Sequence, residues 1–355
     1  MNKVRQFEVD FVKFSAIFFM IWIHVYEQFG RYDYKHLLPT GFFRNIIEFL
    51  GGPMAAPVFM FAMGIGMVYT SHNSPEEFIK RGWKLLFLGF ALNFFRETLL
   101  EILGNLILGM DYSFDYIADG FLNIDILHFA GMTFLIVGLM KKAKICTGMM
   151  VVIGVLLQAI GMWASHLSFS SVIPRNLLGL LLPTGEKVAF PFTLWCLYPL
   201  LGIVFAEYLQ KVLDKDRFYR MLILVSVVAV VAFTSSLCWI GYDIRYIYAL
   251  ADNSYYHQTF ISVLWVVPFV LIALGISHFL FGNIEQTKAG KFINFCSRNL
   301  NVIYIIQWLI IAWMVAFLTA FNKAANLCGI EIFLVGLMIS AMAIGVTALW
   351  KRTRK

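Results

Sequence analysis

The chain has 355 residues, of which 60% are hydrophobic and 14% are charged, and its mean hydropathy is +0.77. A soluble domain is about 45–50% apolar and about 25% charged, so this composition excludes an ordinary soluble protein and indicates a polytopic membrane protein. The net charge of +7 is divided among short connections without one basic patch, and we therefore expect no nucleic-acid partner.

Windows of about 20 apolar residues predict an all-α transmembrane bundle with about ten helices. They are expected near 8–28, 47–70, 83–105, 120–140, 145–165, 188–209, 220–241, 259–281, 297–318 and 327–350. Lys and Arg are concentrated in the connections on the side of the N-terminus, so the positive-inside rule predicts that both termini are cytoplasmic. No hydrophilic stretch is long enough to fold separately, and we expect one membrane domain over residues 1–355.

Five cysteines are scattered through or beside the apolar segments. They are Cys146, Cys196, Cys238, Cys296 and Cys328. Because they form no CxxC pair and no metal-ligand spacing, we interpret them as small buried hydrophobic residues and expect neither a disulfide framework nor a metal site.

The first predicted helix carries ionisable residues near both of its ends. At 100° per residue one stripe of this helix contains Asp10, Lys13, Ile17, Met20, His24 and Glu27. Asp10 and His24 are separated by about 21 Å of helix, most of the roughly 30 Å hydrocarbon layer. Ionisable residues inside membrane helices cost a few kcal/mol each, so they are functional candidates by default.

Two histidines are predicted at similar depth in the outer half of the membrane, His24 near the end of the first helix and His128 near the start of the fourth. Asp125 precedes His128 by three residues and Glu27 follows His24 by three, so each carboxylate could hold one ring nitrogen and leave the other as a base. This pattern is typical of acyl transfer, in which an imidazole takes a proton from an acceptor or carries the acyl group. Histidines that only pin the bundle by hydrogen bonds between helices are the alternative.

Other polar residues are weaker candidates. His36, in the sequence YKHLL just outside the outer surface, is an alternative catalytic residue, although loop histidines are commonly only solvated. Arg96 is interpreted as a member of an internal ion pair with neighbouring carboxylates, with acceptor binding as the alternative. The longer outer connections 106–119, 166–187 and 243–258 are acidic and aromatic, which would suit a polyhydroxyl ligand, with a solvated loop as the plainer interpretation.

Several blocks resemble known families of membrane acyltransferases. The pattern Arg5-x4-Asp10-x2-Lys13-x10-His24 resembles the opening signature of acyltransferase family 3 and its relatives, with Lys13 where arginine followed by glycine is usual. Residues 56–64 (APVFMFAMG), 125–131 (DILHFAG) and 190–202, beginning FPFTLW, resemble blocks of the heparan-α-glucosaminide N-acetyltransferase catalytic-domain family. Residues 298–304 (RNLNVIY) resemble a late block, but Gln307 stands where a histidine is frequent.

The resemblance implies an integral-membrane acyltransferase that moves an acyl group, usually acetyl, from cytoplasmic acyl-coenzyme A to a glycan or another hydroxyl or amine acceptor at the outer face. On this hypothesis His24 and His128 line the reaction centre, one as base or acyl carrier and the other as its partner, and Asp125 orients His128. Asp10 and Lys13 would shape the inner end of the donor channel. Further candidates for donor binding are Lys84, Trp195, Arg298 and Asn301.

Two other classes of function remain open from the sequence. A transporter or flippase for a polar or lipid-linked solute would suit the helix break at Gly51, Gly52 and Pro53, although no inverted repeat is visible. A receptor-like scaffold would tolerate loss of both histidines. The expected partners are membrane lipid, acyl-coenzyme A and a polar acceptor, with oligomerisation left open, and the expected location is a bacterial inner membrane.

Overall fold

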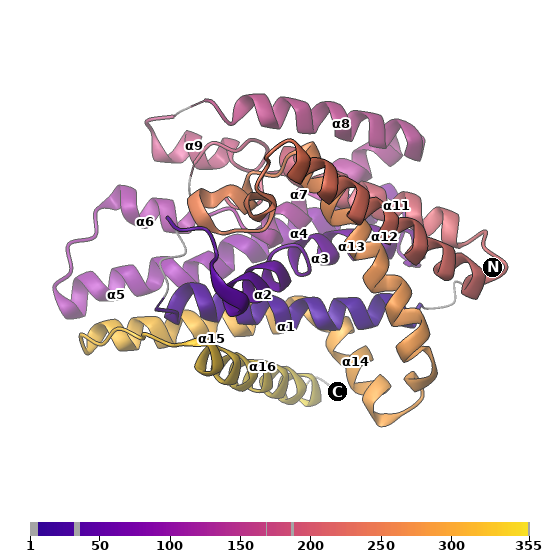
Figure 1. Ribbon diagram of the computed structural model, residues 1–355. Coiled ribbons are helices and arrows are strands. Elements are labelled where there is room, and N and C mark those ends of the chain that lie inside the picture. Colours follow the sequence, from indigo (N-terminus) through magenta and orange to yellow (C-terminus); the bar gives the residue numbers. More distant parts are fainter. Residues whose placement is uncertain (1–5, 32–35, 168, 186–187, 354–355) are drawn as a thin grey trace.

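Helices form nearly all of the molecule in the computed structural model, which describes residues 6–31, 36–167, 169–185 and 188–353 (Figure 1). Within these residues the β pairing consists of two isolated bridges, Gly30 with Leu327 and Ile124 with Val188. The predicted all-α bundle is therefore confirmed.

The α-helices follow one another with short connections. They are α1 (Phe7–Phe29), α2 (Gly41–Gly51), α3 (Ala56–Tyr69), α4 (Pro75–Asn93), α5 (Leu99–Leu108), α6 (Phe114–Phe121), α7 (Ile126–Lys142), α8 (Thr147–Ala164), α9 (Val172–Leu178), α10 (Phe192–Trp195), α11 (Leu197–Leu209), α12 (Lys215–Trp239), α13 (Phe260–Phe281), α14 (Lys288–Arg298), α15 (Leu300–Ala320) and α16 (Gly329–Arg352). A π-helical turn, η1 (Phe94–Thr98), joins α4 to α5, and 3-10 turns are η2 (Ile244–Ile247), η3 (Ala251–Tyr256) and η4 (Gly282–Ile284).

Eight helical stretches of the described chain are long and apolar enough to cross a membrane, where the sequence predicted about ten. They are Phe7–Phe29, Gly41–Tyr69, Thr147–Ala164, Phe192–Leu209, Lys215–Trp239, Phe260–Phe281, Leu300–Ala320 and Gly329–Arg352. The predicted spans 83–105 and 120–140 are not among these eight stretches. The first is divided by η1 and belongs to a helix that begins in a charged turn, and the second corresponds to α7, whose 17 residues extend only about 26 Å.

Two predicted helices are broken at positions where the backbone has another partner. The predicted helix 47–70 is divided into α2 and α3 at Gly52 and Pro53. The predicted helix 120–140 begins only at Ile126, because Ile124 pairs with Val188 and Asp125 caps the first turn of α7. One break lies at a glycine and a proline, and the other lies at an aspartate whose side chain bonds to the backbone in place of a helical hydrogen bond.

The first helix, α1, is the central element of the bundle. It packs against α2, α3, α13, α14, α15 and α16. Ala16, Ile17, Val25 and Tyr26 are almost completely buried in these contacts. A polar group on this helix is therefore surrounded by protein over most of its length, which allows charged side chains to persist inside an apolar bundle.

Glycines bring two other helix pairs into close contact. A Cβ atom at Gly64 of α3 would lie 2.0 Å from the carbonyl oxygen of Pro199, and one at Gly202 of α11 would lie 2.1 Å from that of Phe61. Gly82 of α4 and Gly131 of α7 approach each other's carbonyl groups in the same way. Small residues at helix crossings let backbones approach closely in membrane proteins.

The periphery is apolar and includes α8, α12, α15 and α16. Most side chains in the membrane-length window of α12 are exposed in the isolated chain, as expected for a surface that faces lipid. All five cysteines are free thiols, but only Cys196 and Cys296 are buried. The expectation that every cysteine is buried is wrong for Cys146 and Cys238, since these positions are on the outside of the bundle.

Candidate functional site

A cavity of about 870 Å³ opens at the end of the bundle where α5, α6 and the C-terminal end of α15 lie together, at the left of Figure 1. Its walls come from the second half of α1, from η1 and α5, from residues 110–126 and 250–256, and from α15. These segments all belong to the side that the distribution of basic residues predicts to be extracytoplasmic.

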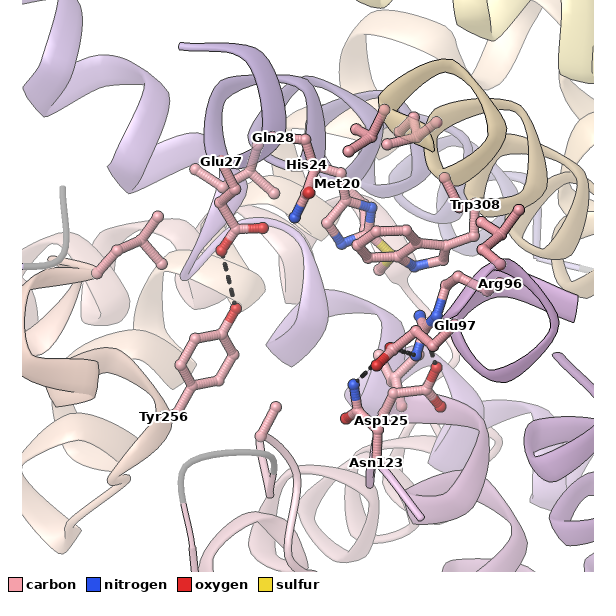
Figure 2. Close-up of a pocket in the computed structure, with 18 of the residues that line it drawn as sticks. Met20, His24, Glu27, Gln28, Arg96, Glu97, Asn123, Asp125, Tyr256 and Trp308 are labelled. Atoms are coloured by element: carbon pink, nitrogen blue, oxygen red, sulfur yellow. Dashed lines mark hydrogen bonds and ion pairs between the residues drawn. The ribbon is translucent and has the colours of Figure 1, made fainter. Parts of the chain in front are cut away.

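His24 lines this cavity near the C-terminal end of α1. Its Nδ1 atom lies 3.2 Å from Nε2 and 3.4 Å from Oε1 of Gln307, a residue of α15 that is completely buried. The imidazole ring also lies 4.1 Å from the ring of Trp308, between ring centroids. Figure 2 shows the two rings against each other at the cavity wall. The histidine is thus held in one orientation by an amide and an indole.

The π-helical turn η1 carries Arg96 and Glu97 into the same cavity. The Arg96 guanidinium lies 4.6 Å from the centre of the Trp308 ring, and its Nη2 atom contacts Glu97 at 3.1 Å and Asn93 at 2.8 Å. Asn123 donates a hydrogen bond of 2.8 Å to Glu97. A π-turn inserts one residue into a helix and is frequent at functional sites, because it re-aims side chains that a regular helix would place elsewhere.

Asp125 joins the charged group around Arg96 to helix α7. Its Oδ2 atom lies 3.4 Å from Nη1 of Arg96 and accepts a hydrogen bond of 3.2 Å from the hydroxyl of Tyr304. Its Oδ1 atom accepts a hydrogen bond from the backbone N–H of Leu127 at 2.9 Å and lies 3.2 Å from Nδ1 of His128. The carboxylate therefore caps α7, and both of its oxygens have hydrogen-bond partners. These partners compensate for the loss of water around a residue that is only 6% exposed.

His128 lies on the other side of Asp125, outside the cavity. It is completely buried, its ring centroid is 4.4 Å from that of Phe90, and its Nδ1 atom accepts the N–H of Asp125 in a reciprocal cap. A Cβ atom at Gly89 would lie 2.7 Å from Nε2, so the backbone of α4 closes over this nitrogen. The expected contact between Asp125 and His128 is present, but the expectation that His128 lines one centre together with His24 differs from the structure.

Acidic and aromatic residues also line the cavity, and one of them, Glu27, lies one turn beyond His24 on α1. Glu27 accepts a hydrogen bond of 3.2 Å from the hydroxyl of Tyr256, and Figure 2 shows this pair across the open space from Asn123 and Asp125. The rings of Tyr112 and Tyr116 stack at 5.1 Å between centroids. The sequence suggested that Glu27 would hold His24, but the contacts of His24 Nδ1 described here are with Gln307.

His36 also lines the cavity, although its side chain is exposed in the connection before α2. No ring contact or hydrogen bond to the Gln307 and Trp308 pair orients it among the described residues. His24 and His36 therefore both line the cavity. Gln307 and Trp308 orient His24, whereas neither of them contacts His36 in the described chain.

The N-terminal end of α1 is a separate polar region. Asp10 is 5% exposed and accepts a hydrogen bond of 2.6 Å from Ser297 of α14, and Glu8 accepts one of 2.9 Å from Tyr219 of α12. Lys13 is half-buried on the same helix. None of these three residues lines the cavity that contains His24.

The remaining donor-binding candidates lie in different parts of the molecule. Lys84 is exposed on α4, which packs on α7, whereas Arg298 is exposed at the end of α14, and Asn301 is half-buried in the first turn of α15. Trp195 is completely buried between the rings of Phe190, Tyr198 and Tyr255. None of these four residues lines the outer cavity within the described chain.

Several cavity residues could not be assigned a role from the sequence. Gln307 was noticed only as a position where histidine is frequent, and Trp308, Tyr304 and Tyr256 appeared as ordinary aromatics of apolar helices or loops. The signal that could have identified them is Gln307 itself, a polar and completely buried residue inside the apolar run of α15. The partners of these residues come from segments more than 100 residues apart, so no local pattern specifies them.

Comparison with known proteins adds one match. Residues 5–239 match the family model described as "Heparan-alpha-glucosaminide N-acetyltransferase, catalytic", which covers α1 to α12 and includes His24, Arg96 and Asp125. The wall formed by residues 250–256 and by α15 lies beyond the matched range. A search of curated proteins finds no match.

Proposed function

Because the chain belongs to the heparan-α-glucosaminide N-acetyltransferase catalytic family, we propose that it is a membrane acyltransferase that moves an acetyl group from acetyl-coenzyme A to an amine or hydroxyl acceptor in the outer cavity. The observation that carries this proposal is the placement of His24. An imidazole fixed by Gln307 and Trp308 faces a cavity of about 870 Å³ that also contains a buried arginine.

His24 is the general base of the proposed reaction. When Oε1 of Gln307 accepts the Nδ1 proton, Nε2 keeps the lone pair that removes a proton from the acceptor. The Trp308 ring, 4.1 Å from the imidazole between centroids, limits its rotation. Holding a base in one orientation reduces the entropy that the transfer step must otherwise overcome.

Arg96 supplies positive charge at the acetyl carbonyl in this proposal. Arg96 is buried and lines the cavity, and its guanidinium lies over the Trp308 ring that also contacts His24. A preorganised donor of this kind stabilises the oxyanion that forms when the carbonyl is attacked. Glu97 and Asp125 keep the guanidinium in place, because each contacts it from a different side.

The transfer requires only the thioester and the acceptor. The acceptor nitrogen or oxygen attacks the acetyl carbonyl, the carbon–sulfur bond of the thioester breaks, and the coenzyme A thiolate leaves. The proton taken by His24 passes to the thiolate or to water. The donor is proposed to arrive from the cytoplasmic side, past Asp10 and Lys13 at the inner end of α1, with Lys84, Trp195, Arg298 and Asn301 as candidates that bind it.

The test is transfer of a labelled acetyl group by purified protein in liposomes. Glucosamine is the first acceptor to use, because the family's description names a glucosaminide. We expect labelled N-acetylglucosamine from acetyl-coenzyme A, a decrease of about 10²- to 10⁴-fold in turnover for His24→Ala, and a change of less than about tenfold for His36→Ala.

The same preparation separates the proposal from its rivals. A transporter would move glucosamine across the liposome membrane unchanged and would form no labelled product with any variant. Full turnover in His24→Ala combined with its loss in His36→Ala would transfer the role of base to His36 and overturn the assignment of His24.

A further inference from the structure

The segment 250–256 forms one wall of the outer cavity with an uncommon backbone. Asp252 and Asn253 both line the cavity and both have left-handed backbone conformations, with φ angles of 51° and 55°. Among residues other than glycine, Asp and Asn adopt this conformation most readily, but two such residues in succession need support from their surroundings.

A completely buried carboxylate holds the start of this segment. Glu48 of α2 accepts the backbone N–H of Leu250 at 3.1 Å through Oε2, and through Oε1 it accepts the hydroxyl of Tyr26 at 2.7 Å and Nη2 of Arg44 at 3.0 Å. The wall is therefore tied to α1 and α2 through a paired charge. A buried ion pair with every hydrogen bond satisfied is rigid, because any movement leaves a charge without its partner.

Further hydrogen bonds hold the rest of the segment. Ser254 and the N–H of Tyr255 both donate to the carbonyl oxygen of Ala249, at 2.9 and 3.0 Å. The Tyr255 hydroxyl donates to the carbonyl oxygen of Gly52 at 3.1 Å, and that of Tyr256 donates to Glu27 at 3.2 Å. These bonds use main-chain groups, Ser254 and the two tyrosines, and not the side chains of Asp252 and Asn253.

Resting on the proposed function, we infer that Asp252 and Asn253 determine acceptor specificity by binding its hydroxyl groups, with Glu48 as the positioning residue of the wall. A carboxylate accepts hydrogen bonds and an amide both donates and accepts them, so adjacent Asp and Asn side chains suit neighbouring hydroxyl groups of a polyhydroxyl acceptor. The wall stands beyond the part of the chain that matches the family, residues 5–239. The transfer group and the recognition group thus come from different parts of the sequence.

Glycine variants separate this inference from a purely structural role. Asp252→Gly and Asn253→Gly, combined in one protein, preserve or ease the left-handed backbone and remove only the side chains. Asn322→Gly is the matched control, since Asn322 has a φ of 51° and lies outside the cavity lining. The acceptors are glucosamine and cyclohexylamine, an amine of similar ring size without hydroxyl groups.

The double variant is expected to raise KM for glucosamine about tenfold, which corresponds to the loss of one or two hydrogen bonds. KM for cyclohexylamine and for acetyl-coenzyme A should stay within about twofold of wild type, and so should every constant of Asn322→Gly. An unchanged KM for glucosamine, or an equal rise for both amines, would overturn the inference.

Binding distinguishes failure of this inference from failure of the proposed function. If wild-type protein transfers acetyl to neither amine, the proposed function fails, and glucosamine binding is then followed by tryptophan fluorescence. A weaker Kd for glucosamine in the double variant still supports the recognition wall, whereas an equal Kd or no binding to wild type overturns it.

The positioning role of Glu48 has its own readout. Glu48→Gln keeps the shape of the side chain and removes its charge, and in folded protein we expect KM for glucosamine to rise several-fold while kcat and KM for acetyl-coenzyme A stay near wild type. A parallel loss of kcat, or unchanged acceptor KM, would contradict that role.

Discussion

His24 and His128 are the same residue type at similar predicted depth, yet the structure gives them opposite surroundings. His24 faces a cavity and is held from the side by Gln307 and Trp308. His128 is enclosed between Phe90, the backbone of Gly89 and the carboxylate that caps its own helix. The comparison teaches that a histidine in a membrane helix becomes a candidate for chemistry only when one nitrogen reaches open space.

Arg96 connects the two histidines, so its replacement should have the largest effect on both. Arg96→Met removes the cation that contacts Trp308, beside His24, and Asp125, beside His128. The buried carboxylate of Asp125 and the half-buried one of Glu97 then lose the cation that contacts both, and we expect a loss of about 3–5 kcal/mol in stability together with loss of transfer. Thermal unfolding in detergent measures the first effect. If the variant were as stable as wild type, the contacts of Arg96 with Glu97 and Asp125 would not contribute to the stability of the bundle.

Gly89→Ala acts on His128 alone. The added Cβ would lie 2.7 Å from Nε2 of His128, so the ring or α4 must move, at a cost of about 1–3 kcal/mol. Because His24 is unaffected, kcat in the protein that remains folded should stay within about threefold of wild type. Gly66→Ala is the control, since a Cβ there meets nothing within 4 Å. Loss of kcat with normal stability would return His128 to the reaction centre.

Gln307→Leu acts on His24 alone. It removes the amide that orients Nδ1 and keeps most of the side-chain volume, so kcat should fall about tenfold, the equivalent of one hydrogen bond of about 1.4 kcal/mol. Gln307→His, which can bond Nδ1 again, should restore part of the rate. Steady-state kinetics with both variants checks this. An unchanged kcat for Gln307→Leu would show that turnover does not depend on the orientation that Gln307 gives to His24.

Charge reversal at the inner side should affect neither histidine and have the smallest effect. Arg298→Glu and Lys84→Glu, both at exposed positions, are expected to raise KM for acetyl-coenzyme A by a few-fold without changing kcat. Arg352→Glu, also exposed, serves as the control for a change in net charge. Equal KM values in all three variants would remove Lys84 and Arg298 from the donor site.

Residue spacing predicted which side chains contact each other locally, but it did not predict whether those side chains face the cavity. The i,i+3 relation between Asp125 and His128 predicted a contact that the structure contains at 3.2 Å. The same spacing could not show that α7 starts at Ile126, which turns His128 away from the cavity. That start depends on the bridge between Ile124 and Val188, two residues far apart in the sequence.

The placement of Arg96 illustrates the second limit of the sequence. Its role as an ion-pair partner was predicted from carboxylates close to it in the sequence, and the contact with Glu97 is present. The contact with Asp125 was not predicted, because Asp125 belongs to a different helix end. The π-turn that carries it into the cavity has no recognisable residue pattern, because it is stabilised by packing against α6 and α15 rather than by its own sequence. Apolar periodicity predicted the helices, whereas the cavity arises from where they are interrupted.

The most direct test of the central claim is chemical rescue of the two histidine variants by added imidazole. The cavity beside His24 is open, so imidazole should restore transfer in His24→Ala in proportion to its concentration. His128→Ala, whose ring position is enclosed by Gly89 and Phe90, should keep turnover near wild type in folded protein and should not respond to imidazole. Rescue of His128→Ala, or none of His24→Ala in folded protein that still binds acetyl-coenzyme A, would contradict the assignment of His24 as the base.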